Sequence, residues 1–334
     1  MADIILPLLI VLIAGWIGLL VQVPFTGALI RFRANYTPKG LQLDSEGQAQ
    51  PYVGPVVSNY FAMLRRILRI EGWPGFWKGY VPSAISSILV VIFVGFIGAT
   101  IPKTPGASHS ITVVNSFHLI LYAAFLSLLS TPFTILINRA ITTPHRLPWF
   151  GLRKSLRVLL TPYELHRPWM LYFEPGFGLL IARSLHVSWL VFVQRGVRRI
   201  LLPSLNTDII LDGTDNDVSD TFSKLSPVAL GFYIFFVILS SIAVLTPLEV
   251  ISVRLSVQRN HSEAAGFGPA PQDEEDPELE YAGREEDVIA LRPEEDPYEG
   301  FLHCAKSILQ EEGPETLLRG WWITLLASLA GAFS

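Results

Sequence analysis

The sequence predicts an all-α membrane protein built from three repeats, each with two transmembrane helices. Three observations support this fold class. Half of the 334 residues are apolar and only 16% are charged, against about 25% in soluble domains. Long uncharged stretches recur along the chain, and the prolines near the ends of alternate stretches are each followed by an arginine at a constant spacing.

Five stretches are long enough to cross a bilayer, because about 20 apolar residues do so as a helix. They lie at 4–30, 81–102, 104–138, 177–194 and 227–248. The first is too long for the apolar region of a signal peptide and lacks a basic start, so we expect a retained span. A sixth stretch, 321–334, covers only about 21 Å of a core about 30 Å thick. The sequence therefore predicts five full spans and one short one.

The basic residues indicate how these spans are oriented. The segments that follow spans 1, 3 and 5 hold 19 lysines and arginines, whereas the segments on the other side hold five. Because basic loops stay on one side of a membrane, we expect the three odd-to-even connections on one side and both termini on the other.

The odd spans share a proline near their ends, at Pro24, Pro132 and Pro247. An arginine follows each proline by seven residues. These arginines are Arg31, Arg139 and Arg254. A proline removes a helical hydrogen bond, so each odd helix is expected to bend at the same depth.

The segments after each odd span also repeat. A basic amphipathic segment that suits an interfacial helix comes first. These segments are 56–70, 152–160 and 301–309. A turn that begins with Glu-Gly then opens the even span. It lies at 71–79 and 312–320, with a degraded copy at 164–175. The chain therefore divides into three repeats. Their bounds are 1–102, 103–203 and 204–334.

With these motifs in this order, the chain resembles the mitochondrial carrier family. The resemblance covers nearly the whole chain and rests on the proline-to-arginine spacing, the Glu-Gly turns and the charge sidedness. It implies the mitochondrial carrier fold, with six transmembrane helices, and transport of a small solute by alternating access through a central cavity. It also implies a mitochondrial inner membrane location.

The chain departs from the family at the positions that close the cavity on the matrix side. In the family, an acidic and a basic residue after each proline pair between repeats. Here the acidic positions hold Thr26, Thr134 and Glu249, and the basic positions hold Leu29, Ile137 and Ser252. We therefore expect a weak or apolar closure, in which threonine hydrogen bonds contribute about 1 kcal/mol each.

The resemblance also places substrate contacts on the even spans. The matching residues are Ser86, Leu179, Leu180 and Ala327. One turn further on lies Arg183, the sole base within a span, with His186 beside it. An ionisable residue in the membrane is a functional-site hypothesis, so Arg183 is expected to bind an anionic solute. The alternatives are that Arg183 pairs with backbone carbonyls or Glu249 or faces water, and that His186 has only a packing role.

Two further sets of residues have competing interpretations. Arg31, Arg139 and Arg254 form either a basic ring that attracts anions to the cavity mouth or side chains that reach lipid headgroups. In the family, glycine-marked helix starts bind lipid phosphates, cardiolipin among them. The matching residues are Gly72, Lys78, Gly79, Gly151, Gly300, Arg319 and Gly320. The alternative is that these glycines only form turns.

The acidic residues concentrate in one loop. Segment 262–300 holds 14 of the 29 acidic residues and two bases, so it carries −12 while the rest of the chain carries +8. Such a composition predicts a solvated loop, with a protein-binding segment as the alternative. Cys304 is the only cysteine, which excludes a disulfide-rich secreted domain. The sequence has no catalytic, metal-binding or nucleic-acid-binding motif, so we expect neither an enzyme nor a cofactor-dependent protein.

Two functional hypotheses result. The first is a solute carrier of the inner membrane, with membrane lipid and an unknown small solute as partners. The second is a carrier-fold protein of the outer mitochondrial membrane that does not transport and acts in fusion, membrane organisation or protein insertion. The missing gate charges and the short sixth span favour the second hypothesis, and the usual role of proteins in this family favours the first.

Overall fold

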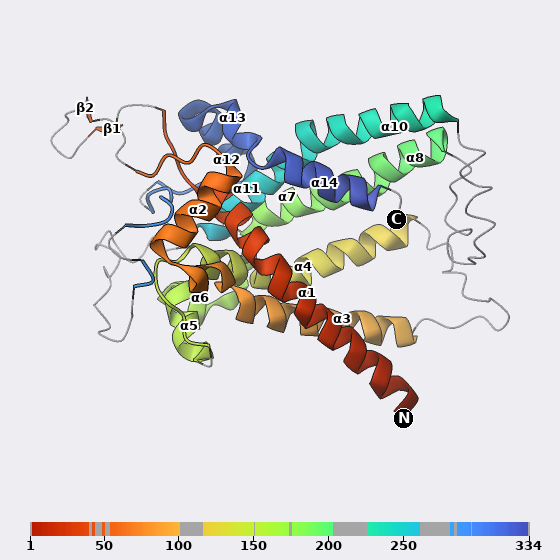
Figure 1. Ribbon diagram of the computed structural model, residues 1–334, viewed down its shortest axis with the longest axis horizontal. Helices are drawn as coiled ribbons and strands as arrows, with labels where there is room; N and C mark the ends of the chain where they lie inside the picture. The colour runs from red at the N-terminus through yellow and green to blue at the C-terminus, as the bar shows by residue number, and fades with distance from the viewer. Residues whose placement is uncertain are drawn as a thin grey trace.

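The computed structural model shows a bundle of helices (Figure 1). The described residues are 2–39, 42–43, 49–50, 54–100, 116–149, 151–173, 176–202, 226–260, 281–283, 286–294 and 296–332. The only strands among them are two short ones, β1 (Gln42–Leu43) and β2 (Ala49–Gln50), which pair antiparallel. An all-α membrane protein is therefore the correct fold class.

The odd spans are long helices. They are α1 (Ala2–Ala34), α4 (Ser116–Thr142) and a third made of α10 (Pro227–Ser240), η4 (Ser241–Leu245) and α11 (Thr246–Val257). Pro24 and Pro132 lie within continuous α-helix, whereas the π-helical η4 ends two residues before Pro247. A change of helix type near the shared proline is therefore confined to the third repeat, where a π-helical turn loosens the backbone.

The even spans differ in length. They are α3 (Tyr80–Thr100), the continuous α7 (Gly176–Ser188), η3 (Trp189–Gln194) and α8 (Arg195–Leu201), and α14 (Trp321–Gly331). Within the described ranges, five helices are long and apolar enough to cross a membrane. The sixth, α14, has 11 residues. The expectation of five full spans is confirmed, and α14 is the shortest of the six.

Short helices connect each odd span to the next even span. The interfacial ones are α2 (Tyr60–Ile70), α5 (Leu152–Leu159) and α12 (Phe301–Ser307). The others are η1 (Trp73–Trp77), α6 (Pro162–His166), η2 (Pro168–Tyr172), η5 (Ile308–Glu312) and α13 (Pro314–Leu317). Helix α2 starts at Tyr60 rather than 56, because the Asn59 side chain accepts a hydrogen bond from the Ala62 N–H and caps it.

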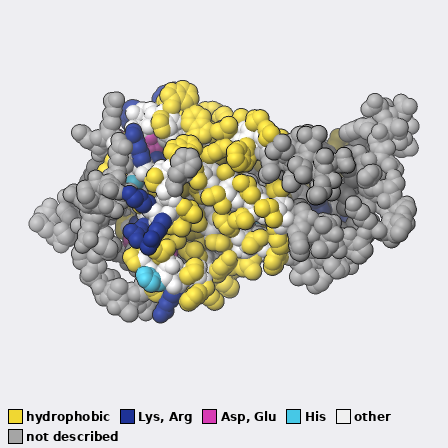
Figure 2. Space-filling view, turned by 90° about the horizontal axis from the view of Figure 1, so that it is seen from below, with side chains coloured by type: hydrophobic (Ala, Val, Ile, Leu, Met, Phe, Trp, Pro, Cys, Tyr) yellow, Lys and Arg dark blue, Asp and Glu magenta, His cyan; other side chains and the backbone are white. Residues whose placement is uncertain are grey.

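The arrangement of these helices agrees with the charge sidedness. The connecting helices α2, α5 and α12 gather at one end of the bundle, and the start of α1 and the end of α14 lie toward the other (Figure 1). Hydrophobic side chains cover the middle of the molecule, and lysines and arginines collect beside the connecting helices (Figure 2). This apolar belt with a basic end is the surface expected of a protein that spans a bilayer.

The core lies toward the end that carries the connections. Helix α11 contacts α1, α4 and α7 there, and two clusters of buried apolar side chains surround these contacts. Part of the acidic loop joins this core, because Val288, Ile289 and Tyr298 are buried. The prediction of a solvated loop is therefore wrong for Val288, Ile289 and Tyr298, whereas the described acidic residues Glu286, Asp287, Glu294 and Glu299 are exposed as expected. Residues 262–280, 284, 285 and 295 lie outside the described ranges.

Candidate functional site

The three arginines that follow the shared prolines are buried and each forms an ion pair within its own repeat. The pairs are Arg31 with Glu71 at 2.6 Å, Arg139 with Glu164 at 2.6 Å, and Arg254 with Glu312 at 2.8 Å. These ion pairs bury the three side chains rather than leave them to reach lipid headgroups, and Arg139 and Arg254 also line a cavity at this end of the bundle. Each pair ties the end of an odd span to the connection that leads to the next even span.

The turns bring the three glutamates to these arginines. Gly72 and Gly313 adopt positive φ angles directly after Glu71 and Glu312, a conformation that favours glycine. Glu164 instead lies in α6, where it forms a capping box with Thr161. The degraded middle motif therefore keeps the same ion pair in a different local structure.

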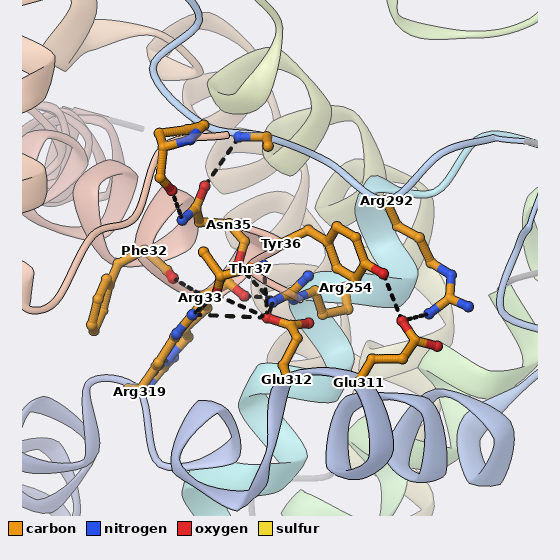
Figure 3. Close-up of polar contacts among 12 residues, drawn as sticks. Phe32, Arg33, Asn35, Tyr36, Thr37, Arg254, Arg292, Glu311, Glu312 and Arg319 are labelled. Atoms are coloured by element: carbon orange, nitrogen blue, oxygen red, sulfur yellow. Dashed lines mark hydrogen bonds and ion pairs between the residues drawn. The ribbon is translucent and has the colours of Figure 1, made fainter. Parts of the chain in front are cut away.

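Glu312 connects the first and third repeats (Figure 3). Its carboxylate accepts hydrogen bonds from Arg254 at 2.8 Å and from the Thr37 backbone N–H at 3.1 Å. Arg319 donates to the backbone carbonyls of Phe32 and Asn35, at the end of α1. The Arg319 side chain thus contacts backbone groups of the first repeat.

Glu311 holds a second contact beside Glu312. It accepts from the Tyr36 hydroxyl at 2.7 Å and from Arg292 at 2.8 Å (Figure 3). Burial and the adjacent Glu311 carboxylate raise the pKa of Tyr36, so the hydroxyl stays protonated and donates. The end of α1 is therefore held to the third repeat by two adjacent acidic residues.

The closure on the side of the connections also contains an ion pair between repeats. Arg33 lies 2.6 Å from Glu249, and Thr324 donates to the same carboxylate at 2.5 Å. Arg33 stands one helical turn after Leu29, the position at which a base was expected and not found. The prediction of a closure without ion pairs is therefore wrong at this contact. Thr26 instead donates within its own helix, to the Gln22 carbonyl at 3.0 Å.

Arg183 joins α7 to α4. It donates to the Thr134 hydroxyl at 2.6 Å and to the Ser130 hydroxyl at 2.9 Å. Its partner is therefore the threonine at a family gate position and not Glu249, as one alternative had it. The two hydrogen bonds engage both terminal nitrogens of the guanidinium.

A cavity of about 360 Å³, here called the central cavity, lies between spans of the second and third repeats, namely α7, η3, α8, α10, α11 and α14. Of the residues expected to contact substrate, His186 and Ala327 line it, and Glu249 lies in its wall. Leu179 is fully buried in the core between α4, α7 and α11. Ser86, Leu180 and Arg183 are not among the described residues that line this cavity.

An apolar cavity of about 560 Å³ opens between the starts of α3 and α5. Lys78, Gly79 and Trp149 line it, and Gly151 immediately precedes α5. The Lys78 ammonium donates to Glu71 at 2.6 Å and to the Thr143 carbonyl at 2.7 Å, so these contacts hold it within the protein. Trp77 also lines this cavity, and its buried Nε1 atom has no hydrogen-bond partner among the described residues.

The glycines expected to bind lipid also have turn roles. Gly72, Gly79 and Gly320 adopt positive φ angles. Gly300 directly precedes α12. A Cβ atom at Gly79 would lie 2.6 Å from the Ile141 side chain. Turn geometry therefore requires glycine at Gly79, whether or not lipid binds.

Comparison with known proteins identifies one part of the chain. A family model described as "Mitochondrial carrier protein" matches residues 235–334. The matched residues run from within α10 past the end of α14, so they include Glu249, the Arg254–Glu312 pair and Thr324. No individual curated protein matches the chain.

Proposed function

Because a model of the mitochondrial carrier family matches residues 235–334, we propose that this chain is a member of that family and moves a small anionic solute across the inner mitochondrial membrane. Members of this family are transporters rather than enzymes, and the five apolar spans fit a multi-pass membrane protein. The solute class, the alternating-access mechanism and the choice of the inner membrane are the proposed elements.

The observation that carries the proposal is the central cavity. Its volume of about 360 Å³ suits a small molecule, since ligand pockets measure about 300–1,000 Å³. His186, Arg195 and Arg198 line it, and Glu249, the one acidic residue among its described lining residues, already pairs with Arg33. Because basic groups outnumber acidic ones in this wall, it favours an anionic solute.

Gln194 adds a polar group that suits such a solute. Its side chain is buried in the wall of the central cavity, and in the described structure its Nε2 atom has no hydrogen-bond partner. A buried donor without an acceptor is unfavourable by about 1–3 kcal/mol. A bound carboxylate or phosphate would relieve that cost.

The contacts on the side of the connections support alternating access. The central cavity extends from Glu249 to Arg198 and Ala332 at the opposite end of the bundle. The Arg33–Glu249 pair and the Glu312 contacts join repeats 1 and 3 on the side of the connections. We propose that solute binding shifts the balance toward a state in which these contacts separate.

Solute uptake into vesicles that contain the purified chain tests this proposal. Arg195→Gln removes a base from the cavity wall, and Arg199→Gln, an exposed neighbour outside it, is the matched control. We expect Arg195→Gln to raise the solute KM about tenfold or more, with Arg199→Gln unchanged. Absence of uptake for a panel of small anions, or equal effects of both variants, would contradict the proposal.

Protease protection of intact mitochondria tests the location. Residence in the inner membrane is expected. Residence in the outer membrane would favour the second hypothesis, a carrier-fold protein without transport activity.

A lipid site is proposed at the cavity between α3 and α5. The start of α3 offers free backbone N–H groups there, and the unpartnered Trp77 Nε1 lies in the same wall. Cardiolipin is expected to stabilise the protein against heat, and Trp77→Phe to reduce that stabilisation. Trp73→Phe, at an exposed position outside this wall, is the control. Equal stabilisation of both variants would contradict the site.

A further inference from the structure

A third cavity, of about 260 Å³, lies beyond the ends of the odd spans. Ala34, Thr142 and Val257 line it. Each stands ten residues after the shared proline of its repeat, so the three occupy equivalent positions around the axis that relates the repeats. We call this space the axial cavity. It lies on the side of the connections, whereas the central cavity extends toward the opposite end.

The third connection forms the remaining wall of the axial cavity, through residues 291–294, 297 and 298. Hydrogen bonds to two spans hold this segment in place. The Asn35 side chain accepts from the Ala290 N–H at 3.0 Å, and Tyr298 exchanges backbone hydrogen bonds with the Gln258 side chain at 2.8 and 3.1 Å. The axial cavity is therefore a defined space and not a gap under a loose loop.

Three buried nitrogen atoms of residues lining this cavity have no hydrogen-bond partner in the described part of the chain. They are Nε of Arg139, Nη1 of Arg254 and Nδ1 of His145. All three side chains are at least nine-tenths buried. An unsatisfied buried polar group is rare in proteins and calls for a partner such as a ligand or ordered water. These three atoms have almost no accessible surface, so a ligand in the cavity would reach them only after a small shift of the surrounding side chains.

The charges around the cavity indicate the class of occupant. Among the described residues that line it are four arginines and His145, against one acidic residue, Glu294. Glu164 and Glu312 pair with Arg139 and Arg254 through other nitrogen atoms. Arg292 pairs with Asp296 and Glu311, and Arg259 lies 3.8 Å from Glu294. The remaining N–H groups of Arg139 and Arg254 thus belong to cations, and they form their strongest hydrogen bonds with anionic oxygen.

We propose that the axial cavity binds one small oxyanion, of the size of inorganic phosphate or a short dicarboxylate, between Arg139, Arg254 and His145. The volume of about 260 Å³ lies below the range of about 300–1,000 Å³ for typical ligand pockets, which favours a small ligand. The oxyanion would join α4, α11 and the third connection, and so stabilise the closed end of the bundle. The site is separate from the central cavity and does not depend on transport.

Equilibrium binding of radiolabelled phosphate, with malonate as competitor, tests the proposal on the purified full chain. A neutral detergent without anionic lipid ensures that no lipid headgroup supplies the anion. Arg139→Lys keeps a charge opposite Glu164 but removes Nε, and His145→Phe removes the ring nitrogens while keeping an aromatic ring. Arg69→Gln, which removes an exposed base outside the cavity, controls for non-specific attraction.

We expect saturable binding of about one phosphate per chain, weakened about tenfold or more by each cavity variant, as for the loss of one hydrogen bond to a charged group. Arg69→Gln should bind as the unchanged protein does. If Arg139→Lys does not fold, His145→Phe decides the outcome. Absence of saturable binding of phosphate and malonate would overturn the proposal and assign the cavity to water. Binding that neither cavity variant weakens would overturn it as well.

Discussion

Replacement of Glu164 by glutamine is expected to destabilise the protein far more than loss of an exposed charge. Glu164 is fully buried and accepts from both terminal nitrogens of Arg139, at 2.6 and 2.8 Å. Glutamine has nearly the same size but no charge, so Arg139 would become a buried cation without a counterion. Breaking such a pair reduces the free energy of unfolding by about 3–5 kcal/mol.

The surroundings of the pair keep the expected loss within that range. The backbone carbonyls of Leu159 and Gln258 also accept from Arg139, and they remain in the variant. The glutamine oxygen still accepts from either the Thr161 or the Asn260 N–H, but the NH2 group leaves the other N–H and one Arg139 N–H without an acceptor. We therefore expect Glu164→Gln to reduce the free energy of unfolding by about 3–5 kcal/mol.

Unfolding in mixed micelles, followed by tryptophan fluorescence, measures this change. Arg69→Gln is the exposed control, because Arg69 lies 3.9 Å from Glu286 with its side chain 68% exposed, and its loss should stay below about 1 kcal/mol. The pair Arg139→Met with Glu164→Leu removes both charges and should lose less than the sum of its single variants. A loss for Glu164→Gln no larger than for Arg69→Gln, or strict additivity of the pair, would refute the reasoning.

Three further predictions follow from single residues. Arg183→Met removes the hydrogen bonds to Thr134 and Ser130 and should reduce the free energy of unfolding by about 1–3 kcal/mol. The preference among anions in the uptake assay should not change. A change of solute preference at unchanged stability would contradict a role in joining α7 to α4. Gly320→Ala places a side chain at a positive φ, with its Cβ 2.5 Å from the Leu29 side chain, and should destabilise the protein by about 1–2 kcal/mol. Gly331→Ala is the control, because a Cβ there meets no atom within 4 Å, and it should be neutral or slightly stabilising. Similar thermal unfolding of both variants would argue against strain at Gly320. Burial raises the pKa of the Cys304 thiol to about 12, so at neutral pH the folded protein should not react with maleimide, which attacks the thiolate; labelling that does not require unfolding would show that the thiol is accessible.

The sequence was sufficient for the features that depend on one segment at a time. The five full spans, the short sixth span and the fold class follow from hydropathy and length, because each apolar segment of sufficient length can cross a bilayer on its own. The charge sidedness likewise predicted that α2, α5 and α12 gather at one end (Figure 1). The repeat spacing placed Arg31, Arg139 and Arg254 in equivalent positions.

The partners of those residues were not predictable in the same way. Arg31 pairs with Glu71, which lies 40 residues away in the sequence, and Arg183 donates a hydrogen bond to Thr134, which lies 49 residues away. The one signal that the sequence did contain was the Glu-Gly motif, whose glutamate pairs with the arginine in the first and third repeats. Arg33 was missed because it lies one turn beyond the position that the family pattern marks.

What the sequence alone determined is therefore the number, order and orientation of the helices, since apolar length and charge act locally and each segment responds to the membrane separately. Only the tertiary structure decided which charges meet and where the cavities lie. A buried ion pair or an unpartnered nitrogen depends on groups from several helices reaching one point. The same three arginines illustrate both levels: their spacing is a property of the chain, and their partners are a property of the packing.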